Sequence, residues 1–145
     1  YEFKFASEPS WNGTNYGDGG GGTLSTSGGN MTVPTGGYYK MNANTVSNTW
    51  SATATTWGLI GSFNGWSGDA DMVYDASSNV WKATINVPAD GEFKFRANHL
   101  WDLNYGDDGT DGTLNEGGAN VPITAGMHTI TLDLHNAGYY YYKIE

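Results

Sequence analysis

A repeat inside the chain constrains its fold more than any other feature of the sequence. The segment Glu92–Phe95 recurs as Glu2–Phe5, and Trp101 has a counterpart in Trp11; members of both pairs are 90 residues apart. Two further segments match in the same order, Asn104–Asp107 with Asn15–Asp18 and Gly112–Leu114 with Gly22–Leu24. Because the matches keep their order over about 50 residues, they indicate tandem duplication of one folding unit.

The two copies are unequal in length. Nothing in the first copy corresponds to residues 57–90. We therefore predict a truncated C-terminal part of one repeat in residues 1–54 and a complete domain in residues 57–145, with 51–56 as the junction. A partial β-sheet unit leaves strand edges unpaired. We expect the first part either to pack on the complete unit or to be a remnant of a longer, multi-domain protein.

The composition and the hydrophobic pattern both predict an all-β fold. The chain has 22 Gly, 10 Tyr and 6 Trp residues, a mixture of turn-forming and strand-forming types. Apolar residues alternate with polar ones over Val80–Val87 and again over Glu92–Asn98, where Phe93, Phe95 and Ala97 share one face. No helical period is present. Six or more such strands, separated by turns, predict an antiparallel β-sandwich.

The charge excludes several classes of partner. The chain carries 15 Asp and Glu against 6 Lys and Arg, a formal net charge of −9. An acidic protein repels phosphate backbones and anionic lipid, so nucleic acid and membrane surfaces are not expected as partners. No apolar run is long enough to predict a transmembrane span. Cys is absent, so neither a disulfide nor thiol chemistry is possible. Neutral ligands stay possible.

Two tryptophans next to turns are the first candidates for ligand binding. Trp66 follows the turn dipeptide Asn64-Gly65, and Trp101 lies in the loop after the strand that carries Lys94 and Arg96. An exposed indole can stack on the apolar face of a sugar ring, and amines and amides can bond its hydroxyl groups. The alternatives are that these tryptophans belong to the core and that the two basic residues only offset nearby acids.

We expect Trp57 and Trp81, which sit in strand patterns, to lie in the core.

Metal binding and catalysis have little support in the sequence. The loop Asp107–Gly112 has alternating carboxylates, but the twelfth position of a calcium loop falls on Gly118 rather than Glu. We interpret this loop as a solvated turn. No carboxylate pair, nucleophile motif or metal-ligand spacing of the histidines stands out. The sequence thus predicts no cofactor, no metal and no enzymatic activity.

Several motifs together resemble a known family. They are Trp57–Trp66 with its Gly-Ser-Phe-Asn-Gly-Trp ending, Val80–Ala83, Phe93–Asn98, and Asn104–Asp107 through Gly112–Leu114. In combination they closely resemble the repeated domains of the SusE/SusF outer-membrane starch-binding proteins of Bacteroidetes. The resemblance spans essentially all of 57–145 and, through the duplication, much of 1–54. The Phe-Asn-Gly-Trp and Phe-Lys-Phe motifs are also similar to glycogen-binding modules.

This resemblance implies immunoglobulin-like sandwiches in tandem, lipid-anchored at the bacterial cell surface, that hold starch or a related α-glucan without cleaving it. It implies that Trp66 and Trp101 stack on glucose and that Lys94 and Asn120 contact its hydroxyl groups; Arg96, on the same strand as Lys94, is a further candidate. Other glycan-uptake proteins of the outer membrane are possible partners. Two alternatives stay open: a structural spacer without a ligand, and an accessory carbohydrate-binding module of a glycoside hydrolase.

Overall fold

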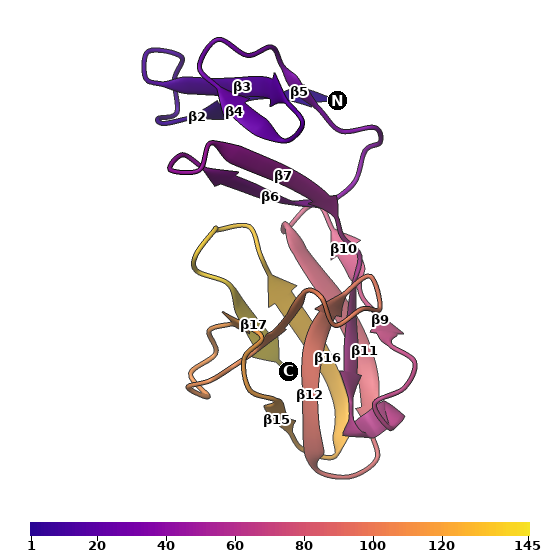
Figure 1. The fold of residues 1–145 in the computed structure, drawn as a ribbon. Coiled ribbons are helices and arrows are strands. Elements are labelled where there is room, and N and C mark those ends of the chain that lie inside the picture. Colours follow the sequence, from indigo (N-terminus) through magenta and orange to yellow (C-terminus); the bar gives the residue numbers. More distant parts are fainter. The chain divides into compact units, whose positions relative to one another are not determined.

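A computed structural model describes all residues from 1 to 145 and divides them into two compact units, Tyr1–Thr55 and Thr56–Glu145. We call these unit 1 and unit 2. Apart from one short 3₁₀ turn, the elements of both units are β-strands, and every paired strand is antiparallel to its neighbour (Figure 1). No helix of the structure has the length and apolar character needed to cross a bilayer.

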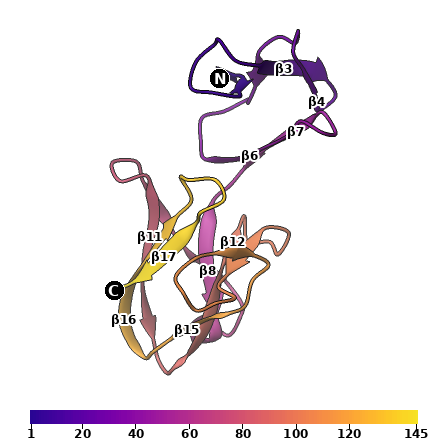
Figure 2. The same ribbon diagram turned by 90° about the vertical axis from the view of Figure 1, so that its left-hand side faces the viewer.

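Unit 2 consists of two sheets packed face to face. Figure 2 shows β11, β16 and β17 in one layer and β8 and β12 in the other. The first sheet has the order β10-β11-β16-β17, and the second has the order β14-β13-β12-β8-β9, with β15 also paired to β12. The strands are β8 (Trp57–Gly61), β9 (Ala70–Asp71), β10 (Val73–Asp75), β11 (Val80–Val87), β12 (Gly91–Ala97), β13 (Asn104–Gly106), β14 (Asn115–Glu116), β15 (Val121–Ile123), β16 (Gly126–Asp133) and β17 (Tyr141–Ile144).

The core of unit 2 lies between these sheets. Phe93 and Phe95 of β12 are fully buried, as are Ile130 and Leu132 of β16. The ring of Phe95 lies 5.8 Å from that of Tyr142, so strands of the two sheets meet across the core. Because alternate side chains of a strand point to opposite faces, this burial leaves the other half of each strand on the outer surface. Trp57 and Trp81 are also buried, as the strand pattern predicts.

Some strands are shorter than their sequence patterns indicate. The strand from Trp57 ends at Gly61, because Ser62–Asn64 form the 3₁₀ turn η1. The last strand begins at Tyr141 rather than Tyr139, since the amide of Tyr139 donates to the carbonyl of Asn136 in a turn. These turns move residues out of the strands and place them at the ends of the sheets.

Unit 1 has a smaller sheet arrangement. One sheet pairs β1 with β5, and the other has the order β2-β3-β4-β7-β6. Its apolar interior includes Met31 and Leu24, and the ring of Phe3 packs edge-on against Trp50 at 5.8 Å. The strands are β1 (Glu2–Phe3), β2 (Phe5–Ala6), β3 (Asn15–Gly20), β4 (Thr23–Ser25), β5 (Met31–Thr32), β6 (Tyr39–Asn44) and β7 (Thr49–Ala54).

The strands of unit 1 pair as their counterparts in unit 2 do. Phe3 opposes Met31 as Phe93 opposes Val121. Three more pairs of unit 1 match pairs of unit 2 in the same way: Phe5–Tyr16 matches Phe95–Tyr105, Gly17–Ser25 matches Gly106–Asn115, and Ala43–Trp50 matches Leu132–Tyr142. Unit 1 has no counterpart of β8 to β11. Residue pairs that the sequence matches align therefore have the same register in both units.

Candidate functional site

The turn after β8 is built around the side chain of Asn64. Its Oδ1 accepts a hydrogen bond from the amide of Gly61 at 3.0 Å, and its Nδ2 donates to the carbonyl of Gly68 at 2.7 Å. Gly65 follows with φ 64°, in the left-handed region that glycine adopts without strain. Trp66 also has a positive φ, 57°. The Asn-Gly dipeptide therefore fixes the direction in which Trp66 leaves the sheet.

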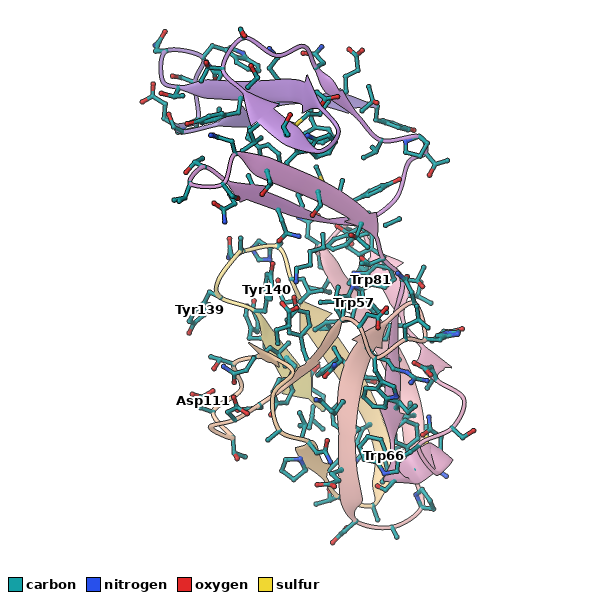
Figure 3. The ribbon with its side chains drawn as sticks, in the orientation of Figure 1. Trp57, Trp66, Trp81, Asp111, Tyr139 and Tyr140 are labelled. Atoms are coloured by element: carbon teal, nitrogen blue, oxygen red, sulfur yellow. The ribbon has the colours of Figure 1, made fainter.

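Trp66 and Trp101 come together on the surface of unit 2. Their ring centroids are 6.4 Å apart and the rings are tilted by 33°. The exposed fraction is 37% for Trp66 and 48% for Trp101, whereas Trp57 and Trp81 are nearly buried. Figure 3 shows Trp66 near the opposite end of unit 2 from Trp57 and Trp81. We call the exposed pair the tryptophan platform. Contiguous exposed apolar surface often marks a binding site, so this pair marks a candidate site.

Arg96 lies under one face of the platform. The centre of its guanidinium group is 4.8 Å from the ring centroid of Trp101, the geometry of a cation–π contact. The same guanidinium donates through Nε and Nη2 to both carboxylate oxygens of Asp69. The side chain of Asp69 is 1% exposed and that of Arg96 is 11% exposed. The hydrogen bonds from Arg96 to Asp69 raise the pKa of Arg96, so the guanidinium group stays charged.

Gly58 makes room for this ion pair. It opposes Arg96 in the sheet, and a Cβ atom added to it would lie 2.9 Å from the Cβ of Asp69. Any larger residue would displace Asp69 from the outer face of β8. The next outward position on β8 is Ile60, which opposes Lys94 and is fully buried. The outer face of this sheet is therefore covered at Ile60.

Lys94 is half-buried on the same face of β12 as Arg96. Burial lowers the pKa of Lys94, and the charge of nearby Asp108 acts in the opposite direction. Its ammonium group forms no hydrogen bond or ion pair. In unit 1 the corresponding Lys4 donates to the carbonyl of Gly28 at 2.9 Å. Lys94 is thus a donor without a hydrogen-bond partner on the face of β12 that also carries Arg96.

Asn120 is occupied by a contact that recurs in both units. Its Nδ2 donates to Oε1 of Glu92 at 2.8 Å, as Nδ2 of Asn30 donates to Oε2 of Glu2 at 3.1 Å. Glu92 lies on β12 two residues before Lys94, so Asn120 borders the same outer face. The carbonyl oxygen of the Asn120 side chain has no partner and can accept a hydrogen bond from a ligand.

The interpretation of Asp107–Gly112 as a solvated turn was wrong for its first residue. Asp107 is 2% exposed and accepts hydrogen bonds from the amides of Gly109, Asp111 and Gly112. The hydroxyl of Tyr142 donates to it as well, at 2.9 Å. Burial alone would raise the pKa of Asp107, but these hydrogen bonds together lower it. Asp107 is therefore a structural anion that holds the loop, a role invisible in sequence because its donors are backbone amides.

The groups of the site suit binding of a ligand more than a chemical reaction. Its paired charged groups are Arg96 with Asp69 and the adjoining His99 with Asp71. Nowhere do three or more His, Asp or Glu side chains form a group that could hold a metal ion. What the arrangement offers is an aromatic surface, a free amine and an amide oxygen, groups that suit a neutral polyhydroxylated ligand.

Sequence reasoning missed Asp69 and Ile60. Asp69 follows the Asn-Gly turn, but no short motif marks its position. Its role depends on Gly58 of β8, three residues before Gly61, which leaves room for the Asp69 side chain. Ile60 reads as an ordinary core residue, because a fully apolar strand does not reveal that both of its faces are covered.

The fold and the tryptophan platform define a carbohydrate-binding β-sandwich module. Residues 34–111 match the family model of carbohydrate-binding module 48, described as the isoamylase N-terminal domain. This match spans more than half of the 145 residues, and the chain belongs to the carbohydrate-binding module 48 family. No curated protein matches the chain.

Membership of this family confirms three expectations. The fold class is an all-β, immunoglobulin-like antiparallel sandwich, and the function is non-catalytic binding of carbohydrate, namely starch or glycogen. The module is not an enzyme on its own. The match runs from the segment before β6 in unit 1 to Asp111 in unit 2, so it includes Trp66, Lys94 and Trp101.

Proposed function

We propose that unit 2 holds an α-glucan chain on Trp66 and Trp101, with Lys94 and Asn120 bonding its hydroxyl groups. The observation that carries this proposal is the pairing of the two exposed indoles at 6.4 Å, one of them over Arg96 on the face of β12 that also carries Lys94. Glucose rings present apolar C–H faces, and two tilted aromatic rings suit a curved α-glucan better than a flat chain. The exposed indoles lose unfavourable contact with water when a sugar covers them.

Arg96 has a different role in this proposal. Because its guanidinium group is clamped by Asp69 and covers one face of Trp101, it positions that ring and leaves the other face to the glucan. A ring held in place costs less conformational entropy on binding than a mobile one. Arg96 therefore acts through Trp101 more than through its own contact with sugar.

We further propose that this module belongs to a SusE/SusF-type starch-binding protein, lipid-anchored in the outer membrane and exposed at the cell surface. The internal repeat and the motif resemblance over 57–145 support this assignment. The description of the family model as an isoamylase N-terminal domain favours a second candidate, an accessory module of an α-glucan-degrading enzyme. Protease treatment of intact cells followed by immunoblotting distinguishes them: loss of the protein supports surface exposure, and full protection contradicts it.

Affinity electrophoresis in gels that contain amylopectin or glycogen tests the proposed binding site. We expect Trp66→Ala and Trp101→Ala each to weaken retention about tenfold or more, since a central interface tryptophan contributes about 2 kcal/mol or more. Val73→Ala, at an exposed position on the other sheet, serves as the control and should migrate as the wild type does. Gels with xylan or mannan should not retard the wild type. Unchanged retention of both tryptophan variants would remove the platform as the glucan site.

A further inference from the structure

A second aromatic cleft lies beside β17. It has a volume of about 360 Å³ and opens on the edge where the loop after β13 meets the last strand. The loop and the strand are joined by backbone hydrogen bonds, from the amide of Tyr142 to the carbonyl of Gly112 and from the amide of Leu114 to that of Tyr140. The residues that line it are Asp111, Gly112, Thr113, Tyr139, Tyr141, Tyr142 and Lys143. We call it the tyrosine cleft.

Two tyrosines of the cleft are fixed by buried carboxylates. The hydroxyl of Tyr142 donates to Asp107, which is 2% exposed. The hydroxyl of Tyr141 is hydrogen-bonded to Asp133, which is 4% exposed, and this bond raises the pKa of Tyr141. Both phenol rings are thus held by their hydroxyl ends, so their orientation is set before any ligand arrives. Such preorganisation is typical of ligand sites.

Other groups of the cleft have no partner within the protein. Tyr139 is 63% exposed and its hydroxyl forms no hydrogen bond. The amine of Lys143 has neither a hydrogen bond nor an ion pair. Asp111 accepts two hydrogen bonds from Thr113 through Oδ1, and its Oδ2 stays free. An exposed aromatic ring, a donor and an acceptor therefore border one opening, which is the set of groups that binds a sugar ring.

The repeat shows that the fold does not require these side chains. In unit 1 the amide of Trp50 donates to the carbonyl of Gly22, and the amide of Leu24 donates to that of Asn48, which reproduces the backbone bonds of the cleft. At the positions of the cleft residues Asp111, Tyr139, Tyr141 and Lys143, unit 1 has Gly21, Ser47, Thr49 and Ser51. The same backbone thus forms without the aromatic and charged groups, so packing alone does not explain their presence in unit 2.

We propose that the tyrosine cleft is a second carbohydrate-binding site, in which Tyr139 and Tyr141 contact one face of a glucan and Asp111 and Lys143 bond its hydroxyl groups. The net charge of −9 and the carboxylate of Asp111 disfavour an acidic polysaccharide, so the ligand is neutral. The proposal takes the ligand class, an α-glucan, from the proposed function but uses none of its residues.

The two sites lie far apart on unit 2. Figure 3 shows Asp111 and Tyr139 on one side of the unit and Trp66 on the other. A short oligosaccharide bound at Trp66 therefore cannot reach the cleft, whereas one long polymer can occupy both sites. Binding at two points raises the apparent affinity for the polymer above that for an oligosaccharide. We expect loss of the cleft to weaken retention in amylopectin gels about tenfold and to leave binding of maltose at the platform unchanged.

Nuclear magnetic resonance of the ¹⁵N-labelled full chain, titrated with maltoheptaose, tests this proposal. We expect the amide signals of Gly112, Thr113 and Tyr142 to shift in the wild type. They should still shift in the variant Trp66→Ala/Trp101→Ala. In the variant Tyr139→Ser/Tyr141→Thr, which carries the residues of unit 1, they should not shift.

The matched controls use the rest of the chain. Tyr1→Ser removes a tyrosine of unit 1 that is 78% exposed, against 63% for Tyr139, and should leave the cleft signals as in the wild type. Tyr139→Ser alone removes a ring that is 63% exposed, so it tests the cleft even if the double variant folds poorly.

Cleft amides that do not move at millimolar maltoheptaose would overturn the proposal, and so would shifts that vanish when only the platform is removed. If the amides near Trp66 and Trp101 stay still while those of the cleft shift, the proposed function fails and the second site stands.

Discussion

Unit 1 and unit 2 share one framework and differ in what it carries. In both, the residues just before the lysine pair in the same register, Glu2 and Phe3 as Glu92 and Phe93 do. Both also hold an Asn side chain on a Glu carboxylate, Asn30 on Glu2 and Asn120 on Glu92. Unit 1 keeps Trp11 where unit 2 has Trp101, and Trp11 is 72% exposed. Yet unit 1 has no strand in the place of β8, and hence no counterpart of the turn that presents Trp66.

The difference teaches that the hydrogen-bonded framework and the binding site are separable. Ala6 stands at the position of Arg96, so unit 1 has no guanidinium group at the position that supports Trp101 in unit 2. The buried anion also weakens: Asp107 has four donors, but Asp18 accepts from the amide of Gly20. Unit 2 has thus gained or kept the fixed side chains that turn a sheet surface into a site.

The Arg96–Asp69 pair provides the largest expected effect. Asp69→Ala leaves a nearly buried guanidinium group unpaired, and breaking such a pair costs about 3–5 kcal/mol. We expect the double variant Asp69→Ala/Arg96→Ala, which imitates Ala6 of unit 1, to regain most of this stability in urea unfolding but not the retention in amylopectin gels. If the double variant is no more stable than Asp69→Ala alone, the pair does not behave as a buried ion pair.

The carboxylates of Asp107 and its counterpart Asp18 come next, of which only Asp107 is buried. Asp107→Ala removes an acceptor from four donors and should destabilise unit 2 by about 2–3 kcal/mol, whereas Asp18→Ala should cost unit 1 about 1 kcal/mol or less. Thermal unfolding followed by circular dichroism at neutral pH measures both. Equal losses at the two positions would contradict the difference between the units.

The same carboxylate predicts a pH dependence. Because the pKa of Asp107 is lowered in the folded chain, the stability it contributes is complete above its ordinary pKa and is lost as the pH falls through the folded value. We expect the urea midpoint of the wild type to fall more steeply below pH 4 than that of Asp107→Asn, which has no charge to titrate. Parallel profiles of the two proteins would exclude this contribution.

His99 provides the smallest expected effect. The residue 90 positions earlier, at the equivalent place in unit 1, is Pro9. The hydrogen bond to Asp71, 2.5 Å long, raises the pKa of His99 above its usual 6.5. The ion pair is present at low pH and is lost as the pH rises through the folded pKa. Both side chains are largely exposed, so the stability it adds is small. An NMR titration should show the pKa of His99 returning toward 6.5 in Asp71→Asn; an unchanged value would assign the shift to another group.

Much of the fold could be predicted from the sequence because alternation reports burial directly. Val80–Val87 is a strand with the bounds that its alternating pattern indicates, and Phe93 and Phe95 face inward as expected. Trp66 and Trp101 are exposed because each follows a turn or loop that carries it out of the sheet. The family resemblance implied that the two rings lie close together. Their spacing in the sequence does not predict this, because it depends on how the loops fold.

Other parts of the candidate site could not be predicted for physical reasons. Asp69 acts through a partner 27 residues away, and Gly58 matters only because Asp69 lies over it. Asp107 seemed a surface residue because acids in Gly-rich segments usually are, whereas here the loop wraps its amides around the carboxylate. The tyrosine run at the end of the chain was interpreted as a strand only. The cleft beside it depends also on the loop Asp111–Thr113, about 30 residues earlier in the sequence, and no local pattern predicts that contact.

The most direct test of the account compares the two equivalent tryptophans. Isothermal titration calorimetry of the full chain with maltoheptaose should show that Trp101→Ala removes binding at the platform, a loss of about tenfold or more in its affinity. Trp11→Ala, which alters the same position of the repeat in unit 1, should bind as the wild type does. If Trp11→Ala weakens binding as much as Trp101→Ala, or if neither does, the glucan is not held by the tryptophan platform of unit 2.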